Sequence, residues 1–196
     1  MKFAVLALVA ALAVSHFAAA QSSSEKPAQQ SAAPAQAAPD PFASVPAPKL
    51  DDVKSIDSIM AAVYDVISGP PGERDWSRFR SLFLPTARLT AATKGPDGTV
   101  RLRPMTADEY ATRAGGYFLK NGFFEHPIVN RAQTFGNVAQ VFSSYESRHA
   151  ASEAPFARGI NSFQLLNDGK RWWVVSILWD EERPDNPLPK DFASKP

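Results

Sequence analysis

Residues 157–182 read "ARGINSFQLLNDGKRWWVVSILWDEE", two runs rich in β-branched and aromatic residues that flank the tetrapeptide "NDGK". An Asp-Gly pair between two such runs is typical of a β-hairpin. The second run contains three tryptophans, Trp172, Trp173 and Trp179. Because neighbouring side chains of a strand point to opposite faces, Trp172 and Trp173 are predicted to lie on different sides of a sheet.

Two further runs of the same kind precede this hairpin. They are "FFEHPIVNRAQ" at 123–133 and "VAQVFSSYESRH" at 138–149. The loop-like segments "TFGN" and "AASEAP" separate the runs. Together the four runs predict consecutive antiparallel strands that are long and strongly curved.

A helical pattern opens the folded part of the chain. Apolar residues recur there at spacings of three and four, at Val53, Ile56, Met60, Val63 and Ile67. This spacing predicts a helix with one apolar face. Asp51 or Asp52 is placed to cap its start, and the "GPP" at 69–71 is expected to end it.

Two more helices are predicted, one on either side of a short hairpin. Asp75 is placed to cap the run "WSRFRSLF", and Thr106 and Glu109 have capping-box spacing at the start of the other helix. Between them "GPDG" at 95–98 joins two strand-like runs. The whole order predicts an α+β domain, with three N-terminal helices packed on a strongly curved, mostly antiparallel sheet.

This element order resembles the nuclear transport factor 2-like superfamily. The segments that carry the resemblance are "RDWSRFRSLFLPTARL" at 74–89 and "DGKRWWVVSILW" at 168–179. The superfamily includes SnoaL-like (polyketide-cyclase-like) proteins, ketosteroid isomerases and scytalone dehydratases. The resemblance implies a cone-shaped half-barrel over residues 50–183, a pocket between helices and sheet, and a tendency to form dimers. It does not by itself assign a reaction.

The first 20 residues have the three parts of a secretory signal peptide. Lys2 supplies the charged region, "FAVLALVAALAV" the apolar region, and a run of small residues ends at Ala20. Residues 21–49 are dominated by Ala, Pro, Gln and Ser and are predicted to form a disordered linker. We therefore expect an exported, periplasmic or secreted protein, cleaved near Ala20, without a stable membrane anchor. Its one folded domain is expected over residues 50–192.

The composition excludes several kinds of site. The chain has no cysteine, which excludes disulfides and thiolate metal sites. Of the 21 Lys and Arg residues only Lys2 lies in the signal peptide, so 20 remain against 20 Asp and Glu residues. A chain without net charge is not expected to bind nucleic acid. His126 and His149 are the histidines that follow the signal peptide, and without an HExxH motif no metal or other cofactor is expected.

Strand pairing predicts a polar row across one face of the sheet. A two-residue turn in "NDGK" pairs Ser176 with Asn161 and puts Trp172 on the same face. A loop centred near residue 153 pairs Asn161 with Tyr145, and a two-residue turn at Phe135 and Gly136 pairs Tyr145 with His126. A few polar groups in an apolar concavity are typical of a small-molecule pocket, so these five residues are predicted to bind a ligand. A register error of one residue would move a strand's side chains to the other face.

Further candidates come from the helices and from side-chain chemistry. Tyr64 and Tyr110 are predicted to add hydroxyl groups at the mouth of the pocket. His126 and Tyr145 are the candidate catalytic residues, because imidazole titrates near neutral pH and a phenol can polarise a ligand oxygen. The same polar row can equally satisfy its own hydrogen bonds inside a core that binds nothing.

The opposite face of the last strand is apolar and needs a cover. In the predicted register Trp173 and Trp179 lie on this outer face together with Phe142. Either the proline-rich C-terminal segment "RPDNPLPKDF" lies across it, or a second copy of the domain does. We expect a homodimer through the outer sheet face, with Trp173 and Trp179 in the interface.

Motifs of common enzyme classes are missing. The sequence has no GxSxG, P-loop or GxGxxG motif, which disfavours a hydrolase nucleophile and nucleotide binding. In the isomerases of the superfamily that the chain resembles, a carboxylate base lies in the first strand after the second helix. Thr90, Ala91 and Ala92 occupy that place here, and none of them can act as a base.

Three hypotheses of function follow. The first is a non-enzymatic exported domain with a small apolar pocket that binds a small ligand or has an accessory role. The second is a cofactor-free isomerase, cyclase or dehydratase that uses His126 and Tyr145. The third is a protein-protein assembly module that docks through the outer sheet face. The neutral charge, the missing base and the apolar concavity favour the first.

Overall fold

The computed structural model describes residues 42–193, and the structural statements below concern these residues. The predicted signal peptide (1–20) and most of the predicted linker (21–49) lie outside this range. No helix in the described part is long and apolar enough to cross a membrane. The elements are α1 (Leu50–Val53), α2 (Ile56–Ile67), α3 (Trp76–Ser81), β1 (Phe83–Lys94), β2 (Val100–Met105), α4 (Ala107–Phe118), β3 (Phe124–Phe135), β4 (Val138–Arg148), β5 (Ala157–Asn167), β6 (Trp172–Glu181) and α5 (Lys190–Ala193).

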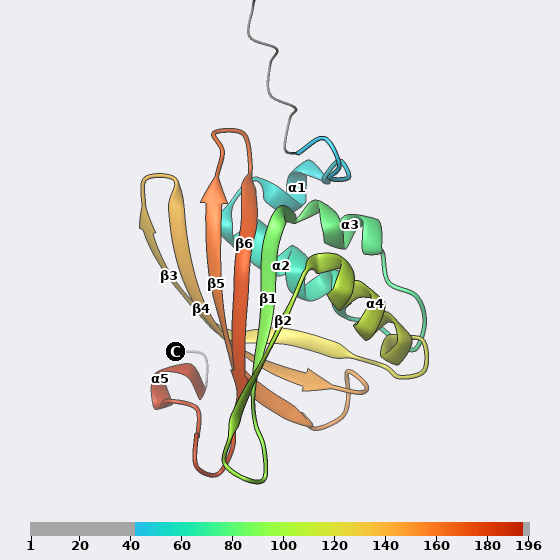
Figure 1. Cartoon of the computed structure of the whole chain (residues 1–196), viewed down its shortest axis with the longest axis vertical. Coiled ribbons are helices and arrows are strands. Elements are labelled where there is room, and N and C mark those ends of the chain that lie inside the picture. Colours follow the sequence, from blue (N-terminus) through green and yellow to red (C-terminus); the bar gives the residue numbers. More distant parts are fainter. Residues whose placement is uncertain (1–41, 194–196) are drawn as a thin grey trace, which may run out of the picture. The chain divides into compact units, whose positions relative to one another are not determined.

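The six strands form one sheet in the order β2-β1-β6-β5-β4-β3. Neighbouring strands are antiparallel except β1 and β6, which are parallel. Strands β3, β4 and β5 bend partway, so that one end of each passes beneath α2 and α4 (Figure 1). The sheet is therefore a trough with α2, α3 and α4 on its inner face. This confirms the predicted α+β architecture of helices on a curved, mostly antiparallel sheet.

Helix starts follow local capping chemistry. Asp75 accepts a hydrogen bond from the Arg78 N–H at 2.8 Å, and Thr106 and Glu109 form the predicted capping box of α4. The first predicted helix is divided into two, because Ser55 adopts an extended backbone and caps α2 by accepting from the Ser58 N–H at 3.1 Å. Asp51 and Asp52, the predicted caps, lie in the first turn of the short helix α1.

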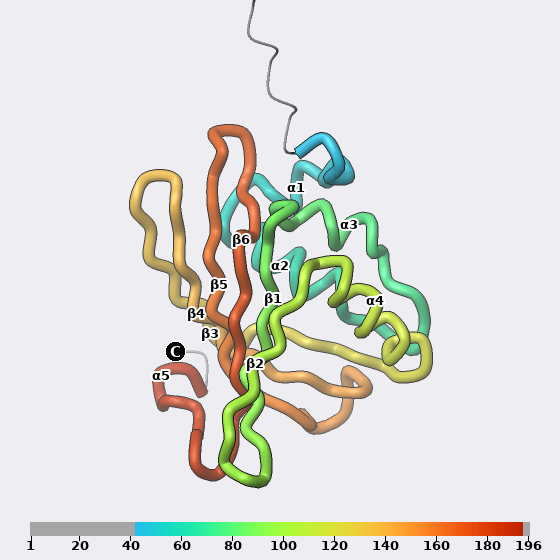
Figure 2. Tube along the Cα trace, viewed as in Figure 1, coloured from blue at the N-terminus to red at the C-terminus, as the bar shows by residue number. Residues whose placement is uncertain are grey.

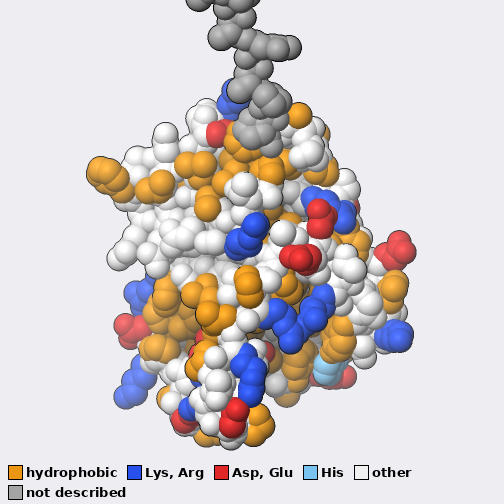
Figure 3. Space-filling view, in the orientation of Figure 1, with side chains coloured by type: hydrophobic (Ala, Val, Ile, Leu, Met, Phe, Trp, Pro, Cys, Tyr) orange, Lys and Arg blue, Asp and Glu red, His pale blue; other side chains and the backbone are white. Residues whose placement is uncertain are grey.

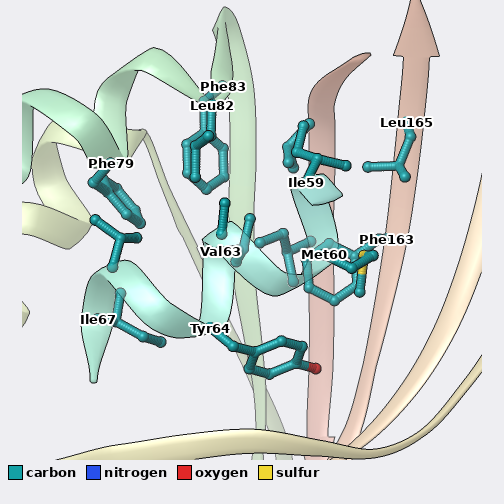
Figure 4. Close-up of a cluster of buried hydrophobic side chains, with 14 of the residues drawn as sticks. Ile59, Met60, Val63, Tyr64, Ile67, Phe79, Leu82, Phe83, Phe163 and Leu165 are labelled. Carbon is teal, nitrogen blue, oxygen red and sulfur yellow. The ribbon is translucent and has the colours of Figure 1, made fainter. Parts of the chain in front are cut away.

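The core lies between α2, α3 and the sheet. Phe79 of α3 packs against the rings of Phe83 and Tyr110 at centroid distances of 4.6 and 5.3 Å. Burial of apolar surface, at about 25 cal/mol per Å², is what holds the helices on the sheet. The side chains that α2 and β5 bury together include Ile59, Met60, Val63, Phe163 and Leu165 (Figure 4).

The C-terminal segment folds back over part of the outer sheet face (Figure 2). Helix α5 contacts β3 and β4, and there the Phe192 ring lies 6.3 Å from that of Phe142 and 5.3 Å from the Arg131 guanidinium. This cover is one of the two predicted alternatives for the outer face. It is partial, because Phe142 and Leu178 stay 39% and 49% exposed. Figure 3 shows apolar side chains gathered beside this segment.

Trp173 lies on the outer side at the other end of β6, and other parts of the chain cover it. The Phe42 ring stacks on it at 5.0 Å, and the Arg171 guanidinium lies 3.6 Å from its ring centroid. Its indole N–H donates to Asp168 at 2.8 Å. Because Trp173 is only 5% exposed, it is not available for the interface in which it was predicted. A dimer through other parts of the outer face stays a prediction.

Candidate functional site

A cavity of about 170 Å³ lies between α2, α4 and the bent ends of the strands. Its walls are largely aromatic and include Phe79, Tyr110, Phe123, Phe156, Phe163 and Trp179. Its polar groups come from Tyr64, Glu125, Tyr145, Ser147, Asn161 and Glu181. Among the described residues, no Lys, Arg or His lines the cavity. An apolar hollow with a few polar groups is the usual form of a small-molecule site.

Glu125 is the less exposed of the two carboxyl groups of this cavity: it is half-buried, whereas Glu181 is exposed. It lies in β3 opposite Ser147 of β4, whose hydroxyl donates to Glu125 Oε2 at 2.8 Å. Burial raises the pKa of Glu125 to about 7, and the charge of Glu181 adds to this, although hydrogen bonds from Ser147 and Asn161 lower it. None of the ion pairs within residues 42–193 includes Glu125. Such a carboxyl group can exchange a proton at neutral pH.

Tyr64, by contrast, belongs to an internal hydrogen-bond network. Asn161 Nδ2 donates to the Tyr64 hydroxyl at 3.1 Å, and this hydroxyl lies 2.5 Å from Ser143 Oγ. Ser143 donates its own hydrogen to Asn130 Oδ1 at 2.6 Å, so the Tyr64 hydroxyl must donate to Ser143. Burial raises the pKa of Tyr64, which keeps it protonated. Tyr64 is therefore a wall residue with a satisfied hydroxyl.

Tyr110 and Tyr145 offer the free hydroxyls of the cavity. Neither hydroxyl has a hydrogen-bond partner among residues 42–193. Burial raises the pKa of both, so both remain protonated donors. Tyr145 fits because residue 159 is glycine: a Cβ there would lie 2.7 Å from the Tyr145 hydroxyl oxygen. Both hydroxyls can therefore donate to a bound molecule.

Four of the seven predicted ligand-binding residues line the cavity, namely Tyr64, Tyr110, Tyr145 and Asn161. Their ligand-binding role stays a prediction. In β4 and β5, Asn161 pairs with Ser143 and not with Tyr145 as predicted. The difference is two residues, and because side chains alternate with a period of two, the predicted faces are kept.

The prediction for His126 is wrong. Its side chain is exposed, and its Nε2 lies 2.7 Å from Glu146 Oε1 on the outer side of the sheet. The cause is a β-bulge: the register between β3 and β4 shifts after Pro127, so that His126 pairs with Glu146 and Tyr145 pairs with Pro127. One extra residue moves His126 to the outer face and Glu125 to the inner face.

A second β-bulge, in β6, changes the face on which the following residues lie. The register with β5 shifts at Val175. Trp172 precedes this point and lies on the inner face, as predicted. It packs against the core there but does not line the cavity. Beyond Val175, Ser176 lies on the outer face, whereas Trp179 and Glu181 line the cavity. The ligand-binding positions predicted for Ser176 and Trp172 are therefore wrong, and Trp179 lies on the inner face and not on the predicted outer face.

Glu125 was missed in the sequence analysis because the predicted register put His126 on the inner face, and the neighbouring Glu125 would then point to the outer face. Pro127 is the signal that could have corrected this. Proline cannot donate to a strand ladder, so within sheets it is found at edges and bulges. β3 is an edge strand, and its bulge follows Pro127 directly. No comparable residue marks the bulge at Val175.

The first strand supplies no acid or base to the cavity. β1 contributes Leu89 to the wall, and the carboxyl groups come from β3 and β6 instead. Within residues 42–193, no group of three or more His, Asp or Glu side chains is arranged to hold a metal ion.

No protein-family model matches the chain, and no curated protein matches it either. Solved structures do match. A protein of unknown function with a cystatin-like fold from Nostoc punctiforme aligns with a TM-score of 0.51 and 11% identity, over 68% of this chain and 92% of that one. An uncharacterized protein with a cystatin-like fold from Caulobacter vibrioides gives 0.50 and 12% identity, over 67% and 90%. An NTF-2 like protein of unknown function from Silicibacter pomeroyi gives 0.48 and 13%, over 66% and 94%.

The chain has the α+β fold of the two cystatin-like proteins, with helices packed on one curved sheet. This confirms the fold that the resemblance implies, helices on a strongly curved and mostly antiparallel sheet. At such low identities the likeness shows the fold alone, and function has to be inferred from the residues of the cavity.

Proposed function

We propose that this protein binds a compact, largely apolar small molecule in the cavity, with Glu125 as the polar anchor. The observation that carries the proposal is the Glu125 carboxyl group, which is half-buried, lines a largely apolar cavity and has no ion-pair partner in the described part of the chain. A buried carboxyl group without a counter-charge costs stability. A ligand that hydrogen-bonds to it would offset this cost.

The cavity also limits the size of the ligand. Its volume of about 170 Å³ is close to the roughly 150 Å³ of an engineered cavity that holds one benzene molecule. The rings of Phe79 and Phe163 would cover the apolar body of the ligand, and Tyr110 and Tyr145 could donate to its oxygen atoms. A single ring with a short polar substituent is the largest ligand that we expect.

A second candidate is a cofactor-free enzyme that moves a proton. It is supported by the pKa of Glu125 of about 7, because a general base works best when its pKa lies near the working pH. Glu125 would take a proton from the bound molecule, and the Tyr145 hydroxyl would donate to the oxygen on which charge develops. This role replaces the one predicted for His126, which lies outside the cavity.

The site of action is part of the same proposal. The signal-peptide pattern of residues 1–20 supports export, so the ligand would be met outside the cytoplasm. Mass spectrometry of the protein recovered from the export compartment tests both points. We expect a chain that begins near Gln21 and that retains a small organic molecule.

The decisive comparison uses Glu125→Gln, which keeps the shape of the side chain and removes its charge. The matched control is Glu73→Gln, an identical change at an exposed residue away from the cavity. We expect Glu125→Gln to lose the retained molecule, and any turnover, while Glu73→Gln keeps both. Equal ligand occupancy in both variants would refute the role of Glu125. A wild-type protein without retained mass, and without a thermal shift across a panel of small ring compounds, would refute the binding function.

A further inference from the structure

The cavity carries negative charge that no described residue neutralises. Glu125 and Glu181 both line it, and neither side chain forms an ion pair within residues 42–193. Arg148 is held by Glu146 at 2.6 Å, and Arg158 lies 3.4 Å from Glu182. The arginines nearest along these strands are therefore already paired outside the cavity.

Every element packed around Glu125 presents a neutral or acidic group to it. Helices α2 and α4 contribute Tyr64 and Tyr110, β4 contributes Tyr145 and Ser147, β5 contributes Asn161, and β6 contributes Glu181. The positive charge that would balance Glu125 is thus not supplied by the described part of the chain.

The walls suit a cation as well as an apolar body. Aromatic rings carry partial negative charge on their faces and attract cations, most strongly where water is excluded. Tyr110, Phe123 and Trp179 line the same cavity as the two carboxyl groups. Carboxylates and aromatic faces together favour an ammonium group.

We propose that the ligand of this cavity is an organic cation: a protonated primary or secondary amine on a compact aromatic or aliphatic body. This inference rests on the proposed function and names the chemical class of its ligand. The ammonium N–H groups would donate to Glu125 beside Ser147, and the body would lie against Phe79 and Phe163. Carboxylate and phosphate ligands would be repelled by Glu125 and Glu181.

Binding of a cation has a definite pH dependence. An ammonium group pairs with the ionised form of Glu125, so its affinity rises as pH rises toward and through 7, and then levels off. Each pH unit below the pKa of Glu125 reduces the ionised fraction about tenfold. A neutral ligand that accepts a hydrogen bond from protonated Glu125 would show the opposite trend.

The test uses three probes of similar size, benzylammonium, benzyl alcohol and benzoate, in calorimetric titrations of the wild type, Glu125→Gln and Glu73→Gln. At pH 8 we expect benzylammonium to bind the wild type at least about tenfold more tightly than the other two. At pH 5.5 its affinity should fall about 30-fold, which follows from the change in ionised Glu125. Glu125→Gln should lose the preference for the cation, and Glu73→Gln should keep it.

Different results refute the cation inference and the binding function. If benzyl alcohol binds as tightly as benzylammonium, or benzoate more tightly, the cation inference is refuted while the binding function stands. If none of the probes binds, the cation inference is refuted, and the binding function is refuted as well if the recovered protein retains no small molecule. If Glu125→Gln fails to fold, the pH series on the wild type decides alone. A second variant, Glu181→Gln, changes an exposed residue that lines the cavity, and it is expected to lower the affinity for benzylammonium about two- to threefold.

Discussion

The two ends of the trough are built from the same strands but differ in what they enclose. At one end, the packed end, Val141 of β4 and Leu165 of β5 are fully buried against α2. At the other, the cavity end, β4 and β5 present Tyr145 and Asn161 to the cavity, and β3 adds Glu125.

The difference shows how one sheet serves stability and binding at once. Burial at the packed end stabilises the fold, since removal of apolar side chains from water is favourable. The cavity end works against this gain, because the half-buried Glu125 carboxyl group is costly when ionised. Removal of an apolar side chain at the packed end should therefore lower the free energy of unfolding. Removal of the Glu125 charge at the cavity end should instead change how this free energy depends on pH.

The largest effect is expected at the packed end. Leu165→Ala should lower the free energy of unfolding by about 2–5 kcal/mol, because it removes buried methyl groups and leaves a cavity. Leu178→Ala is the matched control: this leucine is 49% exposed on the outer face and should cost less than about 1 kcal/mol. Urea denaturation measures both values. Similar losses in the two variants would contradict the placement of the packed core.

The next effect is a pH dependence at the cavity end. The pKa of Glu125 is raised in the folded state from 4.5 to about 7, so the folded protein binds the proton more tightly than the unfolded chain. Its contribution to stability is therefore full below pH 4.5 and is lost as pH rises to 7, by about 2–3 kcal/mol. Denaturation of the wild type and of Glu125→Gln at pH 4.5, 5.5 and 7 measures the contribution of Glu125 to the free energy of unfolding. If the two stability profiles are parallel, Glu125 is not buried as described.

A smaller effect separates the tyrosines of the cavity wall. Tyr64→Phe should cost about 1–2 kcal/mol, because Ser143 and Asn161 lose their partner. Tyr145→Phe should change the free energy of unfolding by less than about 0.5 kcal/mol, since its hydroxyl has no partner among the described residues. It should instead weaken the binding of any ligand that accepts a hydrogen bond. An equal loss of stability in both variants would show that Tyr145 is held by the protein after all.

The smallest effect is expected for His126→Gln. Its contact with Glu146 is an exposed pair, and such pairs contribute less than about 1 kcal/mol. Stability, ligand affinity and any turnover should all stay close to those of the wild type. A variant that folds normally but no longer binds its ligand would restore His126 to the site and place the bulge in β3 in doubt.

Elements and caps could be predicted because their signals are local. The capping box of Thr106 and Glu109, and the cap at Asp75, depend on residues three apart and are found as predicted. The same holds for the strands and for the cavity positions of Tyr145 and Asn161, since errors of two residues in register do not change the face. His126, Ser176 and Trp179 were misplaced because single-residue bulges changed the parity of their strands.

The amino-acid sequence by itself determined the order of helices and strands, the fold and the tyrosines of the cavity wall, because these depend on patterns within a few residues. Only the tertiary structure decided that Glu125, and not His126, faces the cavity. The physical reason is that a strand can accommodate an extra residue as it curves, and one such residue reverses the faces of all side chains beyond it. Where that residue lies depends on the neighbouring strand and on the helices beneath the bend, which neighbours in sequence do not specify.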